Sequence, residues 1–591
     1  MAIAPLRKIT LLGLAEEREL WLEPLQSLGV MHVEENLPIN HVQDPNIAMP
    51  EKAQEALRYL LECRQKIKPW SFDDVSDISY VIEEVLENKQ KRRQLHDLRD
   101  DYLQFIEVRE EWGDFKFPSV EELGGFYLWF YIIPQNQLSK LEDCSYPWQV
   151  VAEKQGRCYV IVLCEHEPTK MEVPFKRVRS GYKSLSQLRK ELNQVEKDLD
   201  QLQVERLSLT RWIDCLGHHL NAIVDDAELS KTKCQVTIEN GLCYIVGWVP
   251  ENLVPLLHDF SKQYSLTYFD EPVPETAEPP TLLQTHPVVS GAKQAVEFFQ
   301  TPAYRTWDPS LVVFVSFNLF FAMILSDAGY ACLCAALTFL YRKKLRDKSL
   351  GVYRLIQSLT GSALVWGVMV GSYFGFSPSP NGILEVLKVV DLNDFDAMIQ
   401  LSMGVGVLHL VIANLSSGYA RKNRWRALGD FGWAIAFVSG FTWFIWDMGR
   451  IGLTIGLLLV FLFSSERSSD TAKNIMWRIL DGLKALTGFS KGFGDVLSYM
   501  RLFALGLSSA QLAITFNGIA ADVRAEVPGI GVLLGFLILL LGHLLNFALG
   551  IMGGVIHGLR LNLIEFLNWG VKSEGYPFKP FAKQEDNRWK Q

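Results

Sequence analysis

Arg501 lies in a stretch that otherwise has the composition of a membrane helix, SYMRLFALGLSSAQLAITF, at residues 498–516. A charged side chain near the centre of a bilayer costs at least a few kcal/mol, so an arginine retained there indicates a function. Apart from Asp495, no acidic residue lies within two turns on the same helical face. We therefore expect the counter-ion of Arg501 to come from another element or another chain.

Polar and small residues form one stripe on each of two consecutive predicted helices. The first stripe consists of Ser498, Arg501, Ser508, Gln511 and Thr515. The second consists of His543, Asn546, Gly550, Gly553, His557 and Arg560. Steps of three, four and seven residues place each set on one helical face. Because the two helices run antiparallel, the stripes are expected to face each other or a shared aqueous cleft.

A packing role is the alternative interpretation of these stripes. Hydrogen bonds between membrane helices, with glycines that permit close approach, account for Ser508, Thr515 and the glycines. The same role competes with channel lining for the two histidines. Packing does not explain Arg501, whereas Arg560 could extend its charge to the cytosol if its helix leaves the bilayer early.

The second half of the chain contains the apolar segments that would carry these stripes. Measured against the roughly 20 apolar residues that a bilayer requires, eight transmembrane helices fit best, within a range of six to eight. They are expected at 310–325, 328–342, 352–375, 397–419, 427–447, 450–464, 488–521 and 529–570. The last two are too long for a perpendicular crossing, so at least the final helix must be strongly tilted or emerge well beyond the bilayer.

Loop charges predict the orientation of these helices. The loops after the second, fourth and sixth helices are basic (YRKKLRDK, ARKNRWR and ERSSDTAKNIMWR). The positive-inside rule places these loops, and both termini, in the cytosol. The N-terminal apolar patch in MAIAPLRKITLLGL is shorter than a signal peptide needs and is followed by AEERE. We therefore expect a multi-pass membrane protein with a cytosolic N-terminal half.

Residues 1–300 are expected to form a cytosolic domain with an α/β lobe at each end of a coiled-coil hairpin. Leu185, Leu188, Leu192 and Val195 begin a heptad seam that continues to Leu216. The two arms are predicted at about 80–112 and 183–216, and two ordinary surface helices are the alternative. The fold class is thus an α-helical membrane protein with an N-terminal α/β dumbbell joined by an antiparallel coiled coil. A membrane domain at 301–575 and a cytosolic tail at 576–591 complete the predicted organisation.

Several functions lack their sequence signatures. The chain has no GxxxxGK[ST] loop, no HExxH or GxSxG motif and no CxxC pair among its nine cysteines. No basic stripe interleaved with aromatic residues indicates nucleic-acid binding. We expect no metal, no cofactor and no catalytic residues, and any ATP must be hydrolysed by another chain.

The stretches SYMRLFALGLSSAQL and GGVIHGLRLNLIEFLNWG resemble the membrane stator subunit of rotary V-type and A-type ATPases, called subunit I in prokaryotes and subunit a in eukaryotes. YIVGWVPE, FFAMILSDAGYA and GYPFKPF support the resemblance, which covers nearly the whole chain. Ser509 and Gly550 depart from the histidine and the acidic residue that the family often carries there. The short length is similar to that of prokaryotic members.

The resemblance implies a role in moving protons or sodium ions across a prokaryotic cell membrane. Arg501 would face the carboxylates of a rotor ring of small membrane subunits, with Arg560 as its partner on the next helix. Candidate residues lining two half-channels are Asp495, Ser498, Ser508, Gln511, His543, Asn546, His557 and Glu565. The cytosolic domain would anchor coiled-coil subunits of the peripheral stalks.

Two other functions compete with this interpretation. A self-contained secondary ion transporter with a cytosolic coiled-coil regulatory domain is the main alternative. It would be favoured by an inverted repeat, which the two halves of the membrane region do not display. A membrane scaffold without ion conduction is the other, and Arg501 with the stripe around His543 argues against it.

Overall fold

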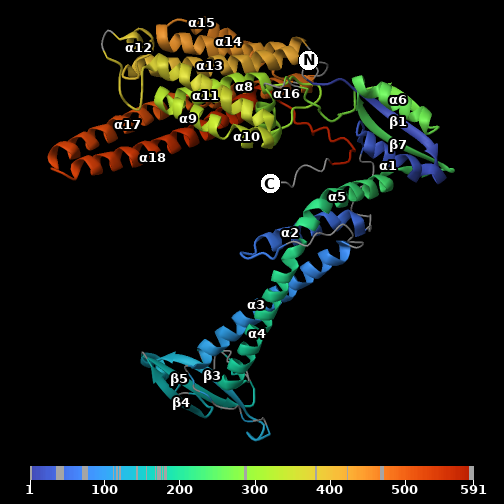
Figure 1. The fold of residues 1–591 in the computed structure, drawn as a ribbon, viewed down its shortest axis with the longest axis vertical. Coiled ribbons are helices and arrows are strands. Elements are labelled where there is room, and N and C mark those ends of the chain that lie inside the picture. Colours follow the sequence, from blue (N-terminus) through green and yellow to red (C-terminus); the bar gives the residue numbers. More distant parts are fainter. Residues whose placement is uncertain are drawn as a thin grey trace. The chain divides into compact units, whose positions relative to one another are not determined.

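A computed structural model describes residues 3–584 with short gaps (Figure 1). The gaps are 35–44, 69–77, 111, 113, 115–117, 119–120, 142–143, 155, 167, 170–172, 174, 176–177, 179–182, 285, 287–288, 380–381, 422–423, 466 and 468–471. The last residues of the predicted cytosolic tail, 585–591, lie outside the described part. The chain forms two compact units. One comprises Met1–Ala15, Val30–Glu34 and Ile238–Pro580, and the other Glu16–Gly29, Glu35–Thr237 and Phe581–Gln591.

The smaller unit is built from helices and one three-stranded sheet. Its helices are α1 (Arg18–Leu28), α2 (Met49–Leu61), α3 (Ile78–Glu110), α4 (Leu185–Leu209) and α5 (Ile213–Gln235). Its strands are β3 (Tyr127–Pro134), β4 (Trp148–Lys154) and β5 (Arg157–Cys164). They form an antiparallel sheet in the order β3-β5-β4. A 3-10 helix at Gln135–Leu141 follows β3.

Helices α3 and α4 pack against each other in opposite directions. Ile106 of α3 packs with Leu185 and Leu188 at the start of α4. Asn88, near the start of α3, donates a hydrogen bond of 3.2 Å to the carbonyl of Leu202, near the end of α4. Contacts whose residue numbers rise in one helix and fall in the other define an antiparallel pair. These helices occupy the two predicted arms, although a 3-10 turn at Thr210–Trp212 divides the second from α5.

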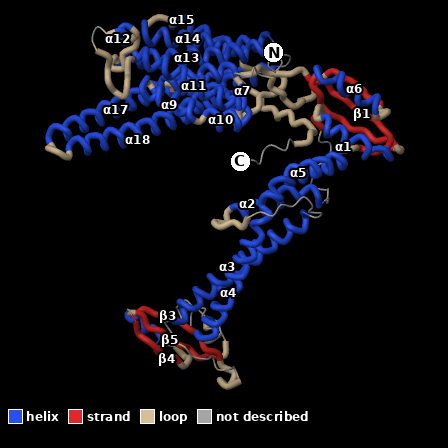
Figure 2. Tube along the Cα trace, viewed as in Figure 1, coloured by secondary structure: helices blue, strands red, loops and turns tan. Residues whose placement is uncertain are grey.

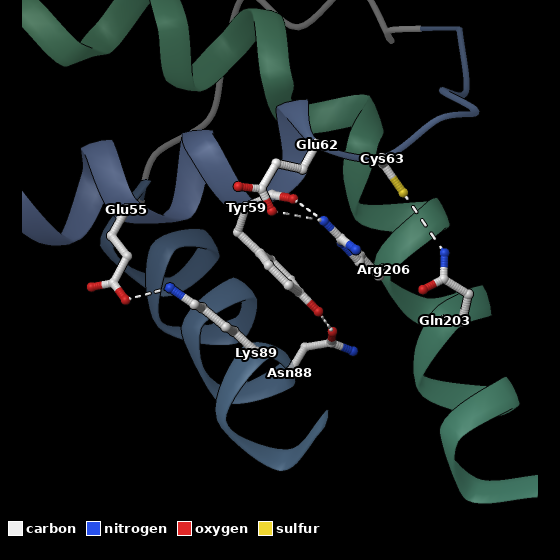
Figure 3. A network of polar contacts seen from close by, with 8 residues as sticks. All are labelled: Glu55, Tyr59, Glu62, Cys63, Asn88, Lys89, Gln203 and Arg206. Atoms are coloured by element: carbon white, nitrogen blue, oxygen red, sulfur yellow. Dashed lines mark hydrogen bonds and ion pairs between the residues drawn. The ribbon is translucent and has the colours of Figure 1, made fainter. Parts of the chain in front are cut away.

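A buried polar network lies where α2 joins this pair (Figure 3). The hydroxyl of Tyr59 donates to Asn88 Oδ1 at 2.9 Å. The guanidinium of Arg206 lies 4.0 Å from the centre of the Tyr59 ring and donates to the carbonyl of the same residue. Glu62 is 3.8 Å from Arg206. Arg206, a polar residue within the leucine seam, therefore contacts α2, a third helix, although its Nε has no hydrogen-bond partner in the described residues.

The larger unit begins with a five-stranded sheet in the order β2-β7-β1-β8, with β6 also paired to β7 (Figure 2). The strands are β1 (Leu6–Leu14), β2 (His32–Val33), β6 (Thr237–Glu239), β7 (Leu242–Pro250) and β8 (Thr267–Pro272). Helix α6 (Val254–Gln263) connects β7 to β8. The N-terminal strand therefore shares a sheet with strands that lie more than 200 residues later.

The remainder of the larger unit is helical. In chain order the helices are α7 (Ser290–Phe299), α8 (Ser310–Leu325), α9 (Ala328–Leu340), α10 (Arg342–Lys348), α11 (Leu350–Val370), α12 (Ile383–Val386), α13 (Phe395–Ala420), α14 (Arg424–Trp446), α15 (Arg450–Phe463), α16 (Ala472–Ser498), α17 (Met500–Glu526) and α18 (Gly531–Arg560). A π-helix at Leu561–Phe566 and α19 (Leu567–Gly570) prolong α18. Helices α17 and α18 form a hairpin whose turn lies away from α13–α15 (Figure 1).

Four of the described helices are long and apolar enough to cross a membrane: Phe395–Ala420, Arg424–Trp446, Lys473–Glu526 and Gly531–Gly570. Three further apolar helices, α8, α9 and α15, have 10–17 residues. A 13-residue helix such as α9 rises only about 20 Å, less than the roughly 30 Å hydrocarbon core. The chain is thus a mainly helical protein with four candidate membrane spans, and the count of eight stays a prediction. The seventh expected span, 488–521, forms part of a helical stretch of 54 residues.

Candidate functional site

The two predicted polar stripes lie on α17 and α18, which pack against each other along the hairpin, except that Ser498 is the last residue of α16. Between them is a pocket of about 320 Å³. From the stripes its lining includes Ser508 of α17 and Asn546, Gly550, Gly553 and His557 of α18. Ser509, apolar residues of both helices and Ile324 of α8 complete the lining. The structure therefore brings four of the six residues of the second stripe and one residue of the first to one cavity.

Arg501 is connected to a buried carboxylate through a serine. Its Nη2 donates to Ser498 Oγ at 3.1 Å, and the Ser498 hydroxyl donates to Glu565 Oε1 at 2.6 Å. The side chain of Glu565 is only 4% exposed. Within the described part of the chain, neither Arg501 Nη1 nor Glu565 Oε2 has a hydrogen-bond partner. The site thus retains one donor on the cation and one acceptor on the carboxylate.

Glu565 lies in the π-helical segment Leu561–Phe566. A π-helical turn inserts an extra residue into the helical register and is frequent at functional sites. Arg560, one residue before this segment, has its Nε 4.0 Å from Glu565 Oε1. Its side chain is 51% exposed, whereas that of Glu565 is buried. Both predicted arginines therefore lie near a single carboxylate, one directly and one through Ser498.

Asp495 and the remaining predicted residues of the first stripe have separate contacts. Asp495 Oδ2 accepts a hydrogen bond of 2.7 Å from the indole of Trp569, and no contact with Arg501 is found in the described part of the chain. Thr515 donates to the backbone carbonyl of Gln511 in its own helix. Gln511 and Thr515 are exposed and are not among the described residues that line the pocket.

A second network links α18 to the first turn of α9 and to α17. Tyr330 Oη is 2.8 Å from His543 Nδ1 and accepts a hydrogen bond of 3.0 Å from Asn546 Nδ2. His543 Nε2 lies 3.1 Å from Asn517 Oδ1 on α17. Ser509 donates to Asn546 Oδ1 at 3.3 Å. These contacts connect polar residues of three helices, α9, α17 and α18, in one array. On α18 the residues of this array precede the pocket residues Gly553 and His557 in the sequence.

Asp327 fixes the start of α9 beside this array. Its side chain is buried and accepts hydrogen bonds from the backbone of Tyr330, Phe374 and Gly375 and from the hydroxyl of Ser372, at 2.7–3.2 Å. A carboxylate with several donors is well stabilised without a cationic partner. Asp327 therefore positions the Tyr330 ring that contacts His543.

The glycines of α18 allow α8 to approach closely. A Cβ at Gly554 would lie 2.7 Å from the Phe321 ring, and one at Gly550 would lie 3.0 Å from Leu325. The nearest atom to a Cβ at Gly553 is 3.8 Å away, so this glycine is not required by packing. The packing interpretation therefore suits Gly550 and does not suit Gly553.

Tyr330, Asp327, Asn517 and Ser509 were not among the predicted site residues. Asp327 and Tyr330 occur in FFAMILSDAGYA, a stretch that supported the family resemblance but to which no role was assigned. Tyr330 contacts His543 and Asn546 of α18, and Asp327 contacts the segment 372–375, so their contacts depend on tertiary packing that no local spacing reveals. Within the described residues, no group of three or more His, Cys, Asp or Glu side chains is arranged to hold a metal ion.

Comparisons with known proteins identify relatives of this chain. The V-type ATP synthase subunit I 1 of Treponema pallidum is 26% identical over 98% of this chain and 100% of its own length. The V-type ATP synthase subunit I of Chlamydia pneumoniae is 27% identical over 60% of this chain and 63% of its own. The A-type ATP synthase subunit I of Methanocaldococcus jannaschii is 28% identical over 57% of this chain and 54% of its own.

Among solved structures, the crystal structure of the cytoplasmic N-terminal domain of subunit I, a homologue of subunit a of V-ATPase, matches 45% of this chain and 99% of its own. Sequence identity is 12% and the TM-score is 0.22, which is too low to establish a shared fold. No protein-family model matches the chain.

Proposed function

Because the chain is a homologue of subunit I of V-type and A-type ATP synthases, we propose that it is the ion-translocating stator subunit of such a rotary ATPase. In this role it provides two half-channels for protons or sodium ions and supplies Arg501 to the passing carboxylates of a rotor ring. It binds no nucleotide itself. The observation that carries the proposal is the placement of Arg501 and Arg560 near one buried carboxylate, beside a pocket lined by the predicted polar stripe.

The proposed mechanism rests on the electrostatics of a carboxylate in a low-dielectric environment. Desolvation disfavours the charged form, so a rotor carboxylate surrounded by lipid retains its ion. A fixed guanidinium favours the ionised form and releases the ion into the exit half-channel. Arginine suits this position because it remains protonated at any relevant pH. Its positive charge also prevents direct leakage between the two half-channels.

Ser498 and Glu565 have a supporting role in this mechanism. The hydrogen bonds from Arg501 to Ser498 and from Ser498 to Glu565 restrict the rotamers of the guanidinium. Arg501 Nη1 is buried and has no partner among the described residues, so the guanidinium is incompletely paired within this chain and would have to turn toward a rotor carboxylate to bind it. The neighbouring pocket, with Ser508, Asn546 and His557, supplies polar groups for one half-channel.

The proposal also covers orientation and partners. Both termini and the basic loops lie in the cytosol of a prokaryotic cell, with eight membrane-spanning helices between them. The cytosolic domain, residues 1–300, binds coiled-coil subunits of the peripheral stalks. Purification of the intact chain from its native membrane tests this part, because recovery without stalk or rotor subunits would contradict it.

Substitution of Arg501 tests the mechanism. Arg501→Ala and Arg501→Gln should abolish ATP-driven ion uptake into vesicles that contain the assembled complex, because an arriving carboxylate would keep its ion. Arg501→Lys should fail largely as well, since an ammonium group lacks the planar fork and can lose its proton when desolvated.

The matched control is Ser508→Ala, on the same helix as Arg501 and in the lining of the pocket between α17 and α18. It should keep most of the transport if the hydroxyl only packs, and Arg560→Ala should be intermediate because its side chain is half exposed. Near-normal coupled pumping by Arg501→Ala would disprove the mechanism.

A further inference from the structure

A second, larger pocket of about 850 Å³ lies in the same unit, at the end of α13 and the start of α14. Four cationic side chains line it: Arg305, Arg421, Arg426 and Lys572. It contains neither of the predicted arginines and none of the polar stripe residues. Its size falls within the range of small-ligand sites.

The walls of this pocket are held by a buried carboxylate. Asp430, whose side chain is 3% exposed, pairs with Arg421 at 2.8 Å and also with Lys572. Ser417 donates to the same carboxylate at 3.5 Å. A buried charge held by two cations restrains both of them, so their remaining donors are already oriented when a ligand arrives.

The pocket retains an excess of positive charge. Among the described residues that line the pocket, Glu275 is the acidic side chain and four are cationic, and Asp430 lies behind two of these cations. Arg305 donates a hydrogen bond to the backbone carbonyl of Pro274. Because this acceptor is neutral, the bond does not neutralise the charge of the guanidinium. A site with two more cations than carboxylates attracts an anion, and guanidinium groups match the oxygens of a phosphate well.

We propose that this basic pocket binds the phosphate group of an anionic ligand, with the headgroup of an anionic phospholipid as the favoured source. The pocket is at the ends of two candidate membrane spans, where lipid headgroups lie. Tyr304 and Trp307 also line it, and such aromatic side chains are typical of the membrane–water interface. Basic pockets between membrane helices bind anionic headgroups in this way.

The test uses the full chain purified in a non-ionic detergent with equal amounts of dioleoyl phosphatidylglycerol and dioleoyl phosphatidylcholine. Native mass spectrometry then measures how much of each lipid stays bound. The test variant is Arg305→Gln with Arg426→Gln, which leaves both cations on Asp430 in place. The control is Arg424→Gln, an exposed residue two positions from Arg426 that is not among the pocket's lining residues.

Wild type should prefer phosphatidylglycerol, the double variant should bind it about tenfold or more weakly, and the control should stay within about twofold of wild type. Competition with inorganic phosphate at constant ionic strength distinguishes the sources. Displacement of the lipid, together with thermal protection of wild type by phosphate, would identify a free phosphate as the ligand.

The proposal is overturned if wild type shows neither a preference for phosphatidylglycerol nor protection by phosphate, a result that does not depend on how the variants fold. It is also overturned if the double variant binds both probes as wild type does. Ion pumping is not part of the readout, so either outcome leaves the proposed stator function unaffected.

Discussion

Arg501 and Asp327 are two charged residues in apolar surroundings, and they differ in how many hydrogen-bond partners their side chains have. Asp327 has its carboxylate surrounded by donors from α9 and from the segment around Phe374. Arg501 has one described hydrogen bond, to Ser498, and a terminal nitrogen without a partner in the described residues. A fully satisfied charge is typical of a structural role, and an incompletely satisfied one of a site that awaits a partner.

Asp327→Asn should lower the thermal stability of the full chain in detergent. The amide would keep one acceptor oxygen but present its own donors to the backbone N–H groups of Phe374 or Gly375. Loss of charge-assisted bonds at a buried site costs on the order of 2–4 kcal/mol. Differential scanning fluorimetry measures the shift in melting temperature.

Asp394→Asn is the control for this change. Asp394 caps the start of α13 at an exposed position by accepting from the backbone of Ala397. Asparagine is an equally good N-cap residue, so the melting temperature should hardly change. Equal effects of the two substitutions would show that Asp327 does not have the structural role described above.

At the scale of elements, the buried network in Figure 3 determines how α2, α3 and α4 pack. Asn88 is 4% exposed and bonds both Tyr59 of α2 and the backbone of α4. Asn88→Ala should therefore weaken the local stability of this pair by about 1–3 kcal/mol, because Tyr59 and a backbone carbonyl would lose their partner. Hydrogen exchange of residues 78–110 and 185–209 in the intact chain measures this change.

Lys89→Ala is the matched control on the next position of α3. Lys89 forms an ion pair with Glu55 at 2.6 Å, and both side chains are more than 40% exposed. Exposed pairs contribute little, so exchange should remain within about 0.5 kcal/mol of wild type. A larger effect from Lys89→Ala than from Asn88→Ala would contradict the importance of the buried amide.

Periodicity predicted the helices well where burial follows a repeat. The seam from Leu185 to Leu216 is helical, and α8 and α15 lie within a residue of their expected bounds. Strand β4 was not predicted; it is an edge strand in which half-buried and exposed side chains alternate, so it lacks a continuous apolar run. The π-helical segment around Glu565 was also missed, because the extra residue arises from packing rather than from local propensity.

Helical spacing predicted which polar residues share one face of a helix, but not which distant residues are hydrogen-bonded to each other. The spacing of His543, Asn546 and His557 placed them on one face, and two of the three line one pocket. The links from Glu565 to Arg501 and from Tyr330 to His543 join residues 64 or more positions apart. Such pairs depend on tertiary packing, which a single sequence does not encode in its local pattern.

At the scale of the whole molecule, the order of the helices and the charges of their loops predict a topology. If all eight predicted spans cross, the loops at 341–351, 420–427 and 465–486 lie in the cytosol together with both termini. Helices α8, α9, α11 and α15, which correspond to the other four predicted spans, decide this question. Three of them, α8, α9 and α15, are shorter than the bilayer core and cross it only if the bilayer thins or flanking side chains extend to the interface. A topology with only the four long spans would place some of these basic loops on the opposite side, against the positive-inside rule.

Cysteine-accessibility labelling in sealed vesicles distinguishes the two topologies. Single cysteines are introduced at Arg346, Arg424 and Lys484 in a chain whose nine native cysteines are replaced, with Glu385 and Asp447 in the alternate loops as controls. A membrane-impermeant maleimide should label the first three only from the cytosolic side and the two controls only from the other side. This result follows because lysine and arginine are retained on the cytosolic side during insertion. With only the four long spans and a cytosolic N-terminus, the position of Arg424 would be labelled from the outside, and those of Glu385 and Asp447 from the cytosolic side. Labelling of two or more of the three basic positions from the outside would also exclude the eight-span topology, and with it the predicted sidedness of Arg501 and the half-channels.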